Sequence, residues 1–204
     1  MHVTLTDIRS LEDERYDAYL DLYQTSFPLN EQMLVSALNR TVREIASGEE
    51  TASAIVVAPD DAGEVVAMAH YEAYDECRGA VLWYLAVAPG KRGIGIGSGV
   101  YKAITARILR ERPSTRAFVY EVERPEDAEG HHRTLAERRI AFYRRNGAKL
   151  LGGIRYTQSV GWQPPVPMHV MVHEFERLSP EAAYEMARSL LGEAVEQVGP
   201  LALE

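Results

Sequence analysis

A strand followed by a glycine-rich turn is the feature that most restricts how this chain can fold. Residues Gly79–Val87 form a continuous apolar run, which is typical of a strand buried on both faces. Gly93, Gly95 and Gly97 then alternate with isoleucine at the start of a predicted helix, Gly95–Glu111. Glycine lets a ligand approach the backbone, and the start of a helix offers unpaired N–H groups with a partial positive charge. We therefore expect a phosphate-binding turn.

The spacing of these glycines excludes two common phosphate motifs. A dinucleotide-binding fingerprint requires G-x-G-x-x-G, but Ser98 stands where the third glycine is needed. A P-loop requires Gly-Lys followed by Ser or Thr, whereas Arg92 follows Gly90-Lys91. Without further motifs, the glycines would also suit a helix that packs closely on a sheet and binds no ligand.

Extended and helical patterns alternate along the rest of the chain, so we expect an α/β protein. A short strand around Val3 and Leu5 precedes a helix that starts near Ser10. A second helix is expected from its cap Asn30 to Gly48. The patterns then predict strands Ala52–Ala58, Glu64–Tyr74, Gly79–Val87, Thr115–Glu123, Lys149–Tyr156 and Pro167–Phe175, and helices Gly95–Glu111, Thr134–Asn146 and Pro180 to about Val195.

Composition restricts the class of protein and the compartment. A length of 204 residues, 46% hydrophobic and 25% charged, favours a single globular domain. No apolar run reaches the roughly 18 residues of a membrane-spanning helix, and the first residues lack the pattern of a signal peptide. Cys77 is the only cysteine, which excludes an internal disulfide and a multi-cysteine zinc site. We expect a cytoplasmic protein that has no membrane partner.

The charge is unevenly distributed. The net charge of −8 argues against a nucleic-acid partner. Residues 91–145 nevertheless contain 13 of the 22 Lys and Arg and only 7 of the 30 Asp and Glu. This segment suits an anionic ligand and the remainder suits a cationic one, although Arg-rich solvated helix faces would give the same count.

Two motifs resemble those of a known family. The stretch Val87-x-Pro89-x-x-Arg92-Gly93-x-Gly95-Ile96-Gly97 resembles motif A of the GNAT superfamily of N-acetyltransferases. The stretch Phe142-Tyr143-x-x-x-Gly147 is similar to the last conserved helix of that family. The order of predicted elements follows the family over roughly residues 2–175.

The resemblance implies the fold and the domain organisation. We expect the GNAT fold, an α/β (α+β) arrangement whose mixed, mostly antiparallel seven-stranded sheet has splayed fourth and fifth strands and flanking helices. Residues 1–178 would form the N-acetyltransferase domain. Residues 179–204 would form a C-terminal helical extension, because the apolar stripe of the last predicted helix needs a surface on the domain or on a second copy in a homodimer.

The resemblance also implies acetyl-CoA as co-substrate. Backbone N–H groups around Arg92, Gly93, Gly95, Gly97 and Ser98 would hold the pyrophosphate of CoA. The backbone at Leu85 and Val87 would bind the pantetheine arm. Many relatives contact pantetheine with an asparagine that Ala136 replaces here, and Arg139 is expected to supply a phosphate contact instead.

Acetyl transfer to an amine needs a base and an acid. Tyr143 occupies the position of the family's general acid, although an aromatic residue at this spacing would also suit a core. Tyr120-Glu121-Val122-Glu123 resembles the strand that carries the base in ribosomal-protein N-acetyltransferases, so Glu121 is the expected base and Glu123 the alternative. Two ordinary carboxylates at a strand end would give the same pattern. Neighbouring like charges would raise one of the two pKa values.

The acceptor is restricted only by charge and by the loops around the site. The segments Phe27–Gln32 and Thr157–Pro167 would form the walls of the acceptor pocket. Glu31, together with the two carboxylates of the fifth strand, would favour a small cationic primary amine. His131 and His132 are adjacent in a predicted loop, so we expect no metal site. The alternative function is a CoA-binding sensor without catalysis.

Overall fold

An eight-stranded sheet organises the computed structural model, which describes residues 3–48 and 51–204. The strand order is β1-β2-β3-β4-β5-β7-β6-β8, and every neighbouring pair is antiparallel except β4 and β5. The strands are β1 Thr6–Asp7, β2 Ser53–Pro59, β3 Val65–Tyr74, β4 Gly79–Val87, β5 Ala117–Glu123, β6 Ala148–Gln158, β7 Val166–Glu174 and β8 Glu196–Leu203. The helices are α1 Glu14–Ser26, α2 Val35–Ala46, α3 Ile96–Glu111, α4 Gly130–Arg145 and α5 Pro180–Leu191, with 3-10 turns η1 Leu29–Glu31, η2 Pro89–Lys91 and η3 Pro125–Asp127.

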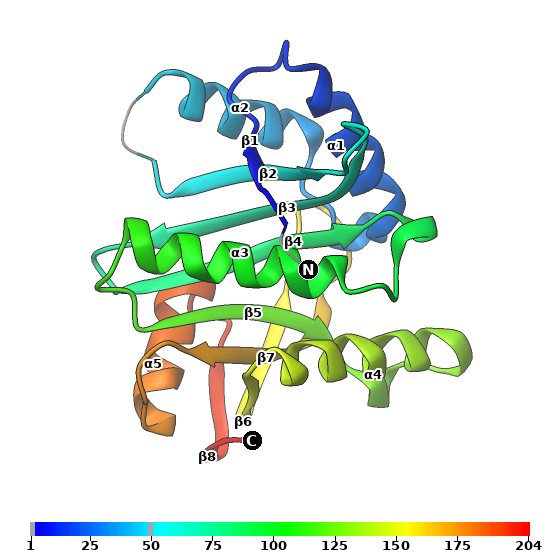
Figure 1. Cartoon of the computed structure of the whole chain (residues 1–204). Helices are drawn as coiled ribbons and strands as arrows, with labels where there is room; N and C mark the ends of the chain where they lie inside the picture. Colours follow the sequence, from blue (N-terminus) through cyan, green and yellow to red (C-terminus); the bar gives the residue numbers. More distant parts are fainter. Residues whose placement is uncertain (1–2, 49–50) are drawn as a thin grey trace.

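Helices cover both faces of the sheet (Figure 1). The alternation of side chains along β5 assigns each layer to a face, because Phe118 and Tyr120 pack in the cluster that contains the buried residues of α3 and Tyr143 of α4. Ala117 and Val119 point the other way and pack under α5. The buried tyrosines of α1 and the apolar residues of α2 form a third cluster on β2, β3 and β4. The sheet is therefore a central layer between two layers of helices.

Strands β4 and β5 separate part-way along their length, as the family resemblance predicted. They pair in parallel only from Gly79 opposite Ala117 to Leu82 opposite Tyr120. The register of β4 against β3 shifts at the same level, because His70 lies opposite Tyr84 whereas Tyr71 lies opposite Leu82, which leaves Trp83 without a partner. Such a bulge bends a strand and increases its local twist. The bulge at Trp83 therefore directs the end of β4 away from β5.

Three helices and one strand begin elsewhere than predicted. Helix α1 begins at Glu14 instead of near Ser10, because the Asp13 side chain caps it by accepting the Arg15 N–H. Asn30 caps no long helix, because it lies in η1, and α2 begins only at Val35. Side chains hold the chain here: Gln32 donates to the carbonyl oxygens of Gln24 and Phe27 at 3.1 and 2.6 Å. Helix α4 begins at Gly130, so His131 and His132 are helical instead of lying in a loop. At the N-terminus, the pairing with β2 starts at Thr6.

The C-terminal segment corrects the predicted seven strands to eight. Helix α5 ends at Leu191. The next residue, Gly192, has a φ of 87°, and its N–H donates to the carbonyl oxygen of Arg188. Residues Glu196–Leu203 then form β8, which pairs with β6 at the edge of the sheet. A Cβ atom at Gly153 would lie 2.1 Å from the carbonyl oxygen of Pro200, so the close approach of these strands requires glycine. The domain boundary expected at residue 178 stays a prediction.

Candidate functional site

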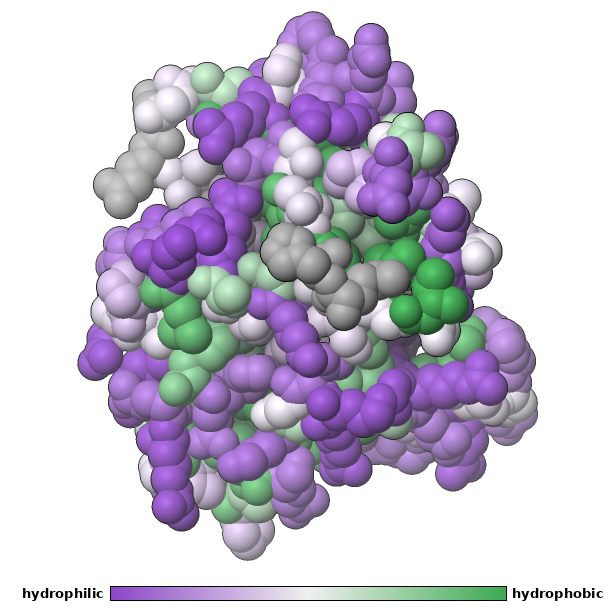
Figure 2. Space-filling model, in the orientation of Figure 1, coloured by the Kyte–Doolittle hydropathy of each residue, from purple (hydrophilic) through white to green (hydrophobic). Residues whose placement is uncertain are grey.

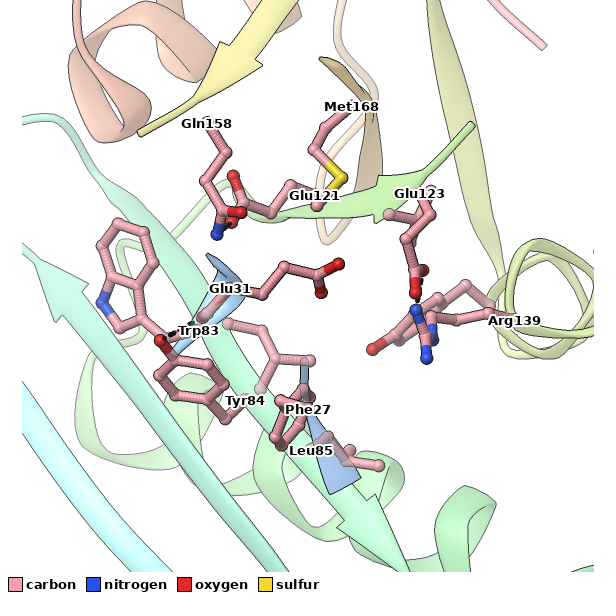
Figure 3. Close-up of a pocket in the computed structure, with 13 residues that line it drawn as sticks. Phe27, Glu31, Trp83, Tyr84, Leu85, Glu121, Glu123, Arg139, Gln158 and Met168 are labelled. Atoms are coloured by element: carbon pink, nitrogen blue, oxygen red, sulfur yellow. Dashed lines mark hydrogen bonds and ion pairs between the residues drawn. The ribbon is translucent and has the colours of Figure 1, made fainter. Parts of the chain in front are cut away.

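A small pocket opens at the point where β4 and β5 separate. Its volume is about 40 Å³, which is enough for a small head group. The lining comes from Phe27 and Glu31 around η1, Leu82–Leu85 on β4, Glu121–Glu123 on β5, Arg139 and Tyr143 on α4, Gln158 on β6 and Met168 on β7. Figure 3 shows these side chains converging from different elements on one space. The pocket thus unites the predicted catalytic residues with the predicted acceptor wall.

Burial changes the acidity of Glu121 in this pocket. Desolvation raises the pKa of its carboxyl group to about 7, although hydrogen bonds with Tyr156 and Gln158 act in the opposite direction. The Gln158 amide donates to Oε1, and Oε2 has no hydrogen-bond partner within the protein. A carboxyl group with a pKa near neutrality is half ionised at pH 7 and can exchange a proton with a bound amine.

Glu123 and Arg139 form an ion pair at the opposite end of the pocket (Figure 3). The side chains are 26% and 34% exposed, so the pair is only partly shielded from water. Arg139 thus contacts a carboxylate of β5, whereas the sequence analysis assigned it to a phosphate. Glu123 already has a cationic partner, and Glu121 has none. This difference favours Glu121 as the residue that faces an incoming cation.

Glu31 adds a third carboxylate to the pocket. Its side chain points into the space between Glu121 and the ion pair of Glu123 with Arg139 (Figure 3). Burial raises its pKa, Arg139 lowers it and the nearby charge of Glu121 raises it again. The Tyr84 hydroxyl fixes the turn that carries Glu31, because it donates to the Glu31 carbonyl at 2.9 Å and accepts the Met33 N–H at 3.1 Å.

Tyr143 reaches the pocket from the face of the sheet that α3 and α4 cover. It is 7% exposed, and its ring lies 4.2 Å from the ring of Tyr120, measured between centroids. Burial raises the pKa of its hydroxyl group to about 12, so the phenol keeps its proton at neutral pH. Glu121 and Tyr143 therefore line one pocket from opposite sides, because the gap between β4 and β5 lets both side chains reach it.

The glycine-rich turn leaves room for a ligand at the start of α3. Gly93 and Gly95 have φ values of 81° and 94°, which L side chains rarely adopt. A Cβ atom built at either position would meet nothing within 4 Å, so the space beside this backbone is open. Ser98 lies in the first turn of α3, where its hydroxyl accepts from Asn146 at 3.2 Å. This geometry fits a pyrophosphate held by backbone N–H groups.

Other residues of the predicted CoA site have partners within the protein. The Arg92 Nε donates to the carbonyl oxygen of Val87 at 2.8 Å. The neighbouring Lys91, which was not assigned to the site, pairs with Asp60 at 3.0 Å. Gly97 lies against Phe142 and Val87, where a Cβ atom would be 3.4 Å from each. Beyond Leu82, the edge of β4 that includes Leu85 has no strand partner on the β5 side within the described residues. Figure 2 shows a hydrophobic patch beside the start of α3, and Ile94 in this turn is 60% exposed.

A larger groove adjoins the small pocket. Its volume is about 790 Å³, and it shares Trp83, Tyr84, Glu121 and Gln158 with the pocket. Its walls come from the start of α2 and from residues 156–163, which include the loop before β7. Leu29 and Gln32 belong to the first segment predicted to surround the acceptor and residues 157–163 to the second, whereas the wall from the start of α2 lies outside both.

Two kinds of feature are missing from the described residues 3–48 and 51–204. No group of three or more His, Cys, Asp or Glu residues in them has the geometry to hold a metal ion. None of their helices combines the length and the apolar character needed to cross a membrane.

Comparisons with known proteins agree with this geometry. The family model for the acetyltransferase (GNAT) domain matches residues 51–147, which include the glycine-rich turn, β5 and α4. This segment, 97 of the 204 residues, belongs to the GNAT acetyltransferase family. The family match indicates an acetyltransferase. A comparison with curated protein sequences found no match.

Solved structures of GNAT proteins share the fold. A putative acetyltransferase from Bacteroides thetaiotaomicron aligns with a TM-score of 0.67 at 22% identity, over 93% of this chain and 98% of that one. A phosphinothricin acetyltransferase from Sinorhizobium meliloti, solved with AcCoA, aligns with a TM-score of 0.55 at 17% identity over 85% and 89%. The ribosomal-protein-S18-alanine N-acetyltransferase from Escherichia coli aligns with a TM-score of 0.55 at 16% identity over 87% and 96%.

The sequence analysis missed several residues of the site. Tyr156 and Gln158 contact Glu121 from β6, and Tyr84 holds η1 in place. Tyr156 and Gln158 are two residues apart and therefore share a strand face, which was the only available signal. The partner strand and the bulge that decide which space they face lie far away in the sequence.

Proposed function

We propose that this GNAT protein is an N-acetyltransferase that moves the acetyl group of acetyl-CoA directly to the primary amine of a small cationic molecule. The observation that carries the proposal is the pocket where β4 and β5 separate, with Glu121 at a pKa of about 7 and Tyr143 lining the same space. The S. meliloti neighbour solved with AcCoA supports this co-substrate. Three carboxylates against one arginine in the pocket favour a cationic acceptor.

The turn before α3 would hold the phosphates of CoA. Open space beside Gly93 and Gly95 and the free N–H groups at the helix start fit a pyrophosphate. Leu85 and Val87 would bind pantetheine through the edge of β4 that has no strand partner, and Arg92, Gly97 and Ser98 complete the proposed site. Arg139 remains a candidate phosphate contact only if it leaves Glu123 on binding. Bound acetyl-CoA supplies the activated acetyl group.

Glu121 and Tyr143 would divide the proton transfers. Glu121 takes one proton from the ammonium group, which frees the lone pair of nitrogen for the C–N bond. As the C–S bond breaks, the electron pair stays on sulfur, and the Tyr143 hydroxyl donates to it. The further proton that leaves nitrogen restores Tyr143, and Glu121 releases its proton to water, so the reaction yields an amide, a thiol and one proton. Because burial raises the pKa of Tyr143 to about 12, we expect its contribution at the lower end of the range for a general acid.

An assay of thiol release tests the proposal against the non-catalytic alternative. The purified protein is incubated with acetyl-CoA and a panel of primary amines at pH 8, and reactions without amine correct for hydrolysis. We expect thiol release that depends on the amine, with the acetylated amine identified by mass spectrometry. Acetyl-CoA binding in calorimetry without thiol release for any amine would instead identify a CoA sensor. The single cysteine, Cys77, leads us to propose a reducing, cytoplasmic location.

A further inference from the structure

The groove beside the pocket differs from it in chemical character. Apolar side chains dominate its walls, among them Leu29, Met33, Leu34, Trp83, Val160 and Trp162. Leu34 is 67% exposed and Trp162 is fully exposed. A volume of about 790 Å³ lies within the range of roughly 300–1,000 Å³ that is typical of small-molecule sites. Exposed apolar side chains gathered around a concave surface are typical of a binding site.

An acceptor whose ammonium group is bound in the pocket would find no free carboxylate in the groove for a second cationic group. Among the described residues that line it, Glu72 and Glu121 are the only charged ones. Ser53 donates to Glu72 Oε1 at 2.6 Å, and Tyr74 and Trp83 donate to Oε2 at 2.6 and 2.8 Å. Burial would raise the pKa of Glu72, but these three donors hold it below its usual range. Its oxygens are thus committed to the protein, and an ammonium group in the groove would find no comparable partner.

We propose that the acceptor is a primary monoamine with an apolar alkyl or aromatic body. Its ammonium group enters the pocket of Glu31, Glu121 and Glu123, and its body lies in the groove against Trp83, Leu34 and Trp162. The continuity of pocket and groove at Trp83, Tyr84, Glu121 and Gln158 lets one molecule occupy both. This inference rests on the proposed function and favours a monoamine over a polyamine, because a second ammonium in the groove would lie against apolar side chains without a carboxylate partner.

Matched pairs of amines test this substrate class by kinetics. Acetylation of butylamine, hexylamine, octylamine and 1,8-diaminooctane is followed by thiol release at one pH. Burial of each added methylene should raise kcat/KM by roughly three- to four-fold until the groove is filled. Octylamine should exceed 1,8-diaminooctane by about tenfold or more, since the two differ only in the terminal group. Equal rates along the series, or a preference for the diamine, would overturn the inference and leave acetyl transfer intact.

Tryptophan fluorescence gives a second readout that needs no turnover. The chain contains two tryptophans, Trp83 and Trp162, and both line the groove. Octylamine should shift the emission to shorter wavelength at concentrations where 1,8-diaminooctane and butylamine leave it unchanged. In Trp162→Phe the emission shift caused by octylamine should be smaller, because Trp83 is then the only tryptophan that contributes to it. Absence of a shift with octylamine contradicts the inference even if no amine is acetylated, so the two proposals fail separately.

A pair of leucine variants distinguishes the contribution of the groove from the effect of replacing any exposed leucine. Leu34 lines the groove, whereas Leu109 on α3 is 40% exposed and lies outside it. Leu34→Gln should flatten the dependence of kcat/KM on chain length, and Leu109→Gln should retain the full dependence. A selection for peptides with apolar N-terminal residues over matched alkylamines would overturn the assignment to a small amine. An unchanged chain-length dependence in Leu34→Gln would likewise contradict the proposed position of the body.

Discussion

Burial decides the acid strength of individual side chains in this protein. Glu121 and Glu123 are two residues apart on β5 and both line the pocket, yet they have different partners. Glu123 pairs with Arg139, and Glu121 meets neutral donors from β6. Desolvation therefore dominates at Glu121 and moves its pKa to about 7. The side chains beside each carboxylate therefore distinguish the two roles. Arg139 makes Glu123 an ion-pair partner, and the absence of a cation beside Glu121 in the described part of the chain leaves it available as the proposed base.

Replacement of Glu121 by glutamine should affect turnover more than binding. Glu121→Gln removes the base and keeps the shape, so we expect kcat/KM for the amine to fall by roughly 10² to 10⁴. In the unmodified protein the rate should rise as the pH passes through about 7, where Glu121 ionises. In the variant this rise should move toward the pKa of the free amine, about 10.4 for a lysine-like amine.

Two controls accompany this prediction. Acetyl-CoA affinity, measured by calorimetry, should be unchanged in Glu121→Gln. Glu123→Gln serves as the matched carboxylate variant on the same strand face. Full turnover in Glu121→Gln together with loss in Glu123→Gln would transfer the role of base to Glu123. Full turnover in the double variant would mean that proton loss occurs through water.

A buried histidine should make the fold sensitive to acid. His70 is 1% exposed, and neither ring nitrogen has a hydrogen-bond partner. Burial lowers its pKa from 6.5 to about 4. The unfolded chain therefore takes up a proton that the folded chain cannot, and stability is lost as the pH falls through 6.5 toward 4. At pH 5 this residue should cost about 2 kcal/mol of unfolding free energy relative to pH 8.

Urea unfolding at pH 8 and pH 5 measures this effect. His70→Gln should reduce the loss of stability between the two pH values, since glutamine does not titrate in this range. His131→Gln is the matched control, because His131 is exposed on α4. An equal pH dependence in all three proteins would show that other groups control acid unfolding.

At the scale of elements, irregular backbone creates the site. The bulge at Trp83 separates β4 from β5, and the pocket lies in the resulting gap. The positive φ values of Gly93 and Gly95 form the turn that leads into α3. The Tyr84 hydroxyl and the Gln32 amide hold η1 so that Glu31 faces the same pocket. Regular helices and strands support these features, and the chemistry lies at their interruptions.

Glycine replacement in the turn should abolish cofactor binding without unfolding the protein. Gly95→Asp introduces a side chain and a negative charge where we expect the pyrophosphate. Gly63→Asp is the matched control, because Gly63 has a similar φ of 86° and likewise no atom within 4 Å of a built Cβ. Both variants should lose similar amounts of stability, about 1–2 kcal/mol. In calorimetry, only Gly95→Asp should fail to bind acetyl-CoA, and equal binding by both variants would contradict the site.

At the scale of the whole molecule, the C-terminal segment supplies the last strand of the sheet and a helix that covers one of its faces. Helix α5 buries Ala183, Met186 and Ala187 against β5 and its neighbours. Strand β8 covers the edge of β6 and carries Pro200, which an edge strand tolerates because one row of its backbone groups faces solvent. These contacts connect the last residues of the chain to the half of the sheet that supplies Tyr156 and Gln158.

Truncation after Ser179 tests the role of this segment. The shortened chain exposes the apolar surface under α5 and the unpaired edge of β6, so we expect a lower Tm and a tendency to associate. Calorimetric unfolding and size-exclusion chromatography measure both properties. A truncated chain with the same Tm and the same oligomeric state would show that residues 180–204 are dispensable for the fold. Dissociation of a full-length dimer into monomers on truncation, without a change in Tm, would support the homodimer considered from the sequence.

Local patterns in the sequence determined most of the elements and the family. The apolar run Gly79–Val87, the glycines before α3 and the pair Phe142-Tyr143 predicted a strand, a turn and a helix that the structure confirms. The splayed strands also followed from the resemblance. These features depend on periodicity and on backbone conformations that are specific to glycine, both of which are encoded within a few neighbouring residues.

Only the tertiary structure decided the features that depend on distant partners. Strand β8 was not predicted, because Gly199 and Pro200 interrupt its pattern and its stability comes from pairing with β6. The partner of Arg139 was not predicted. A raised pKa for one carboxylate of β5 was expected from neighbouring like charges, but the cause at Glu121 is desolvation, which depends on the side chains that fold across the gap between β4 and β5. Desolvation and pairing are properties of the assembled environment. A short stretch of sequence specifies the residues that respond to this environment, but not the environment itself.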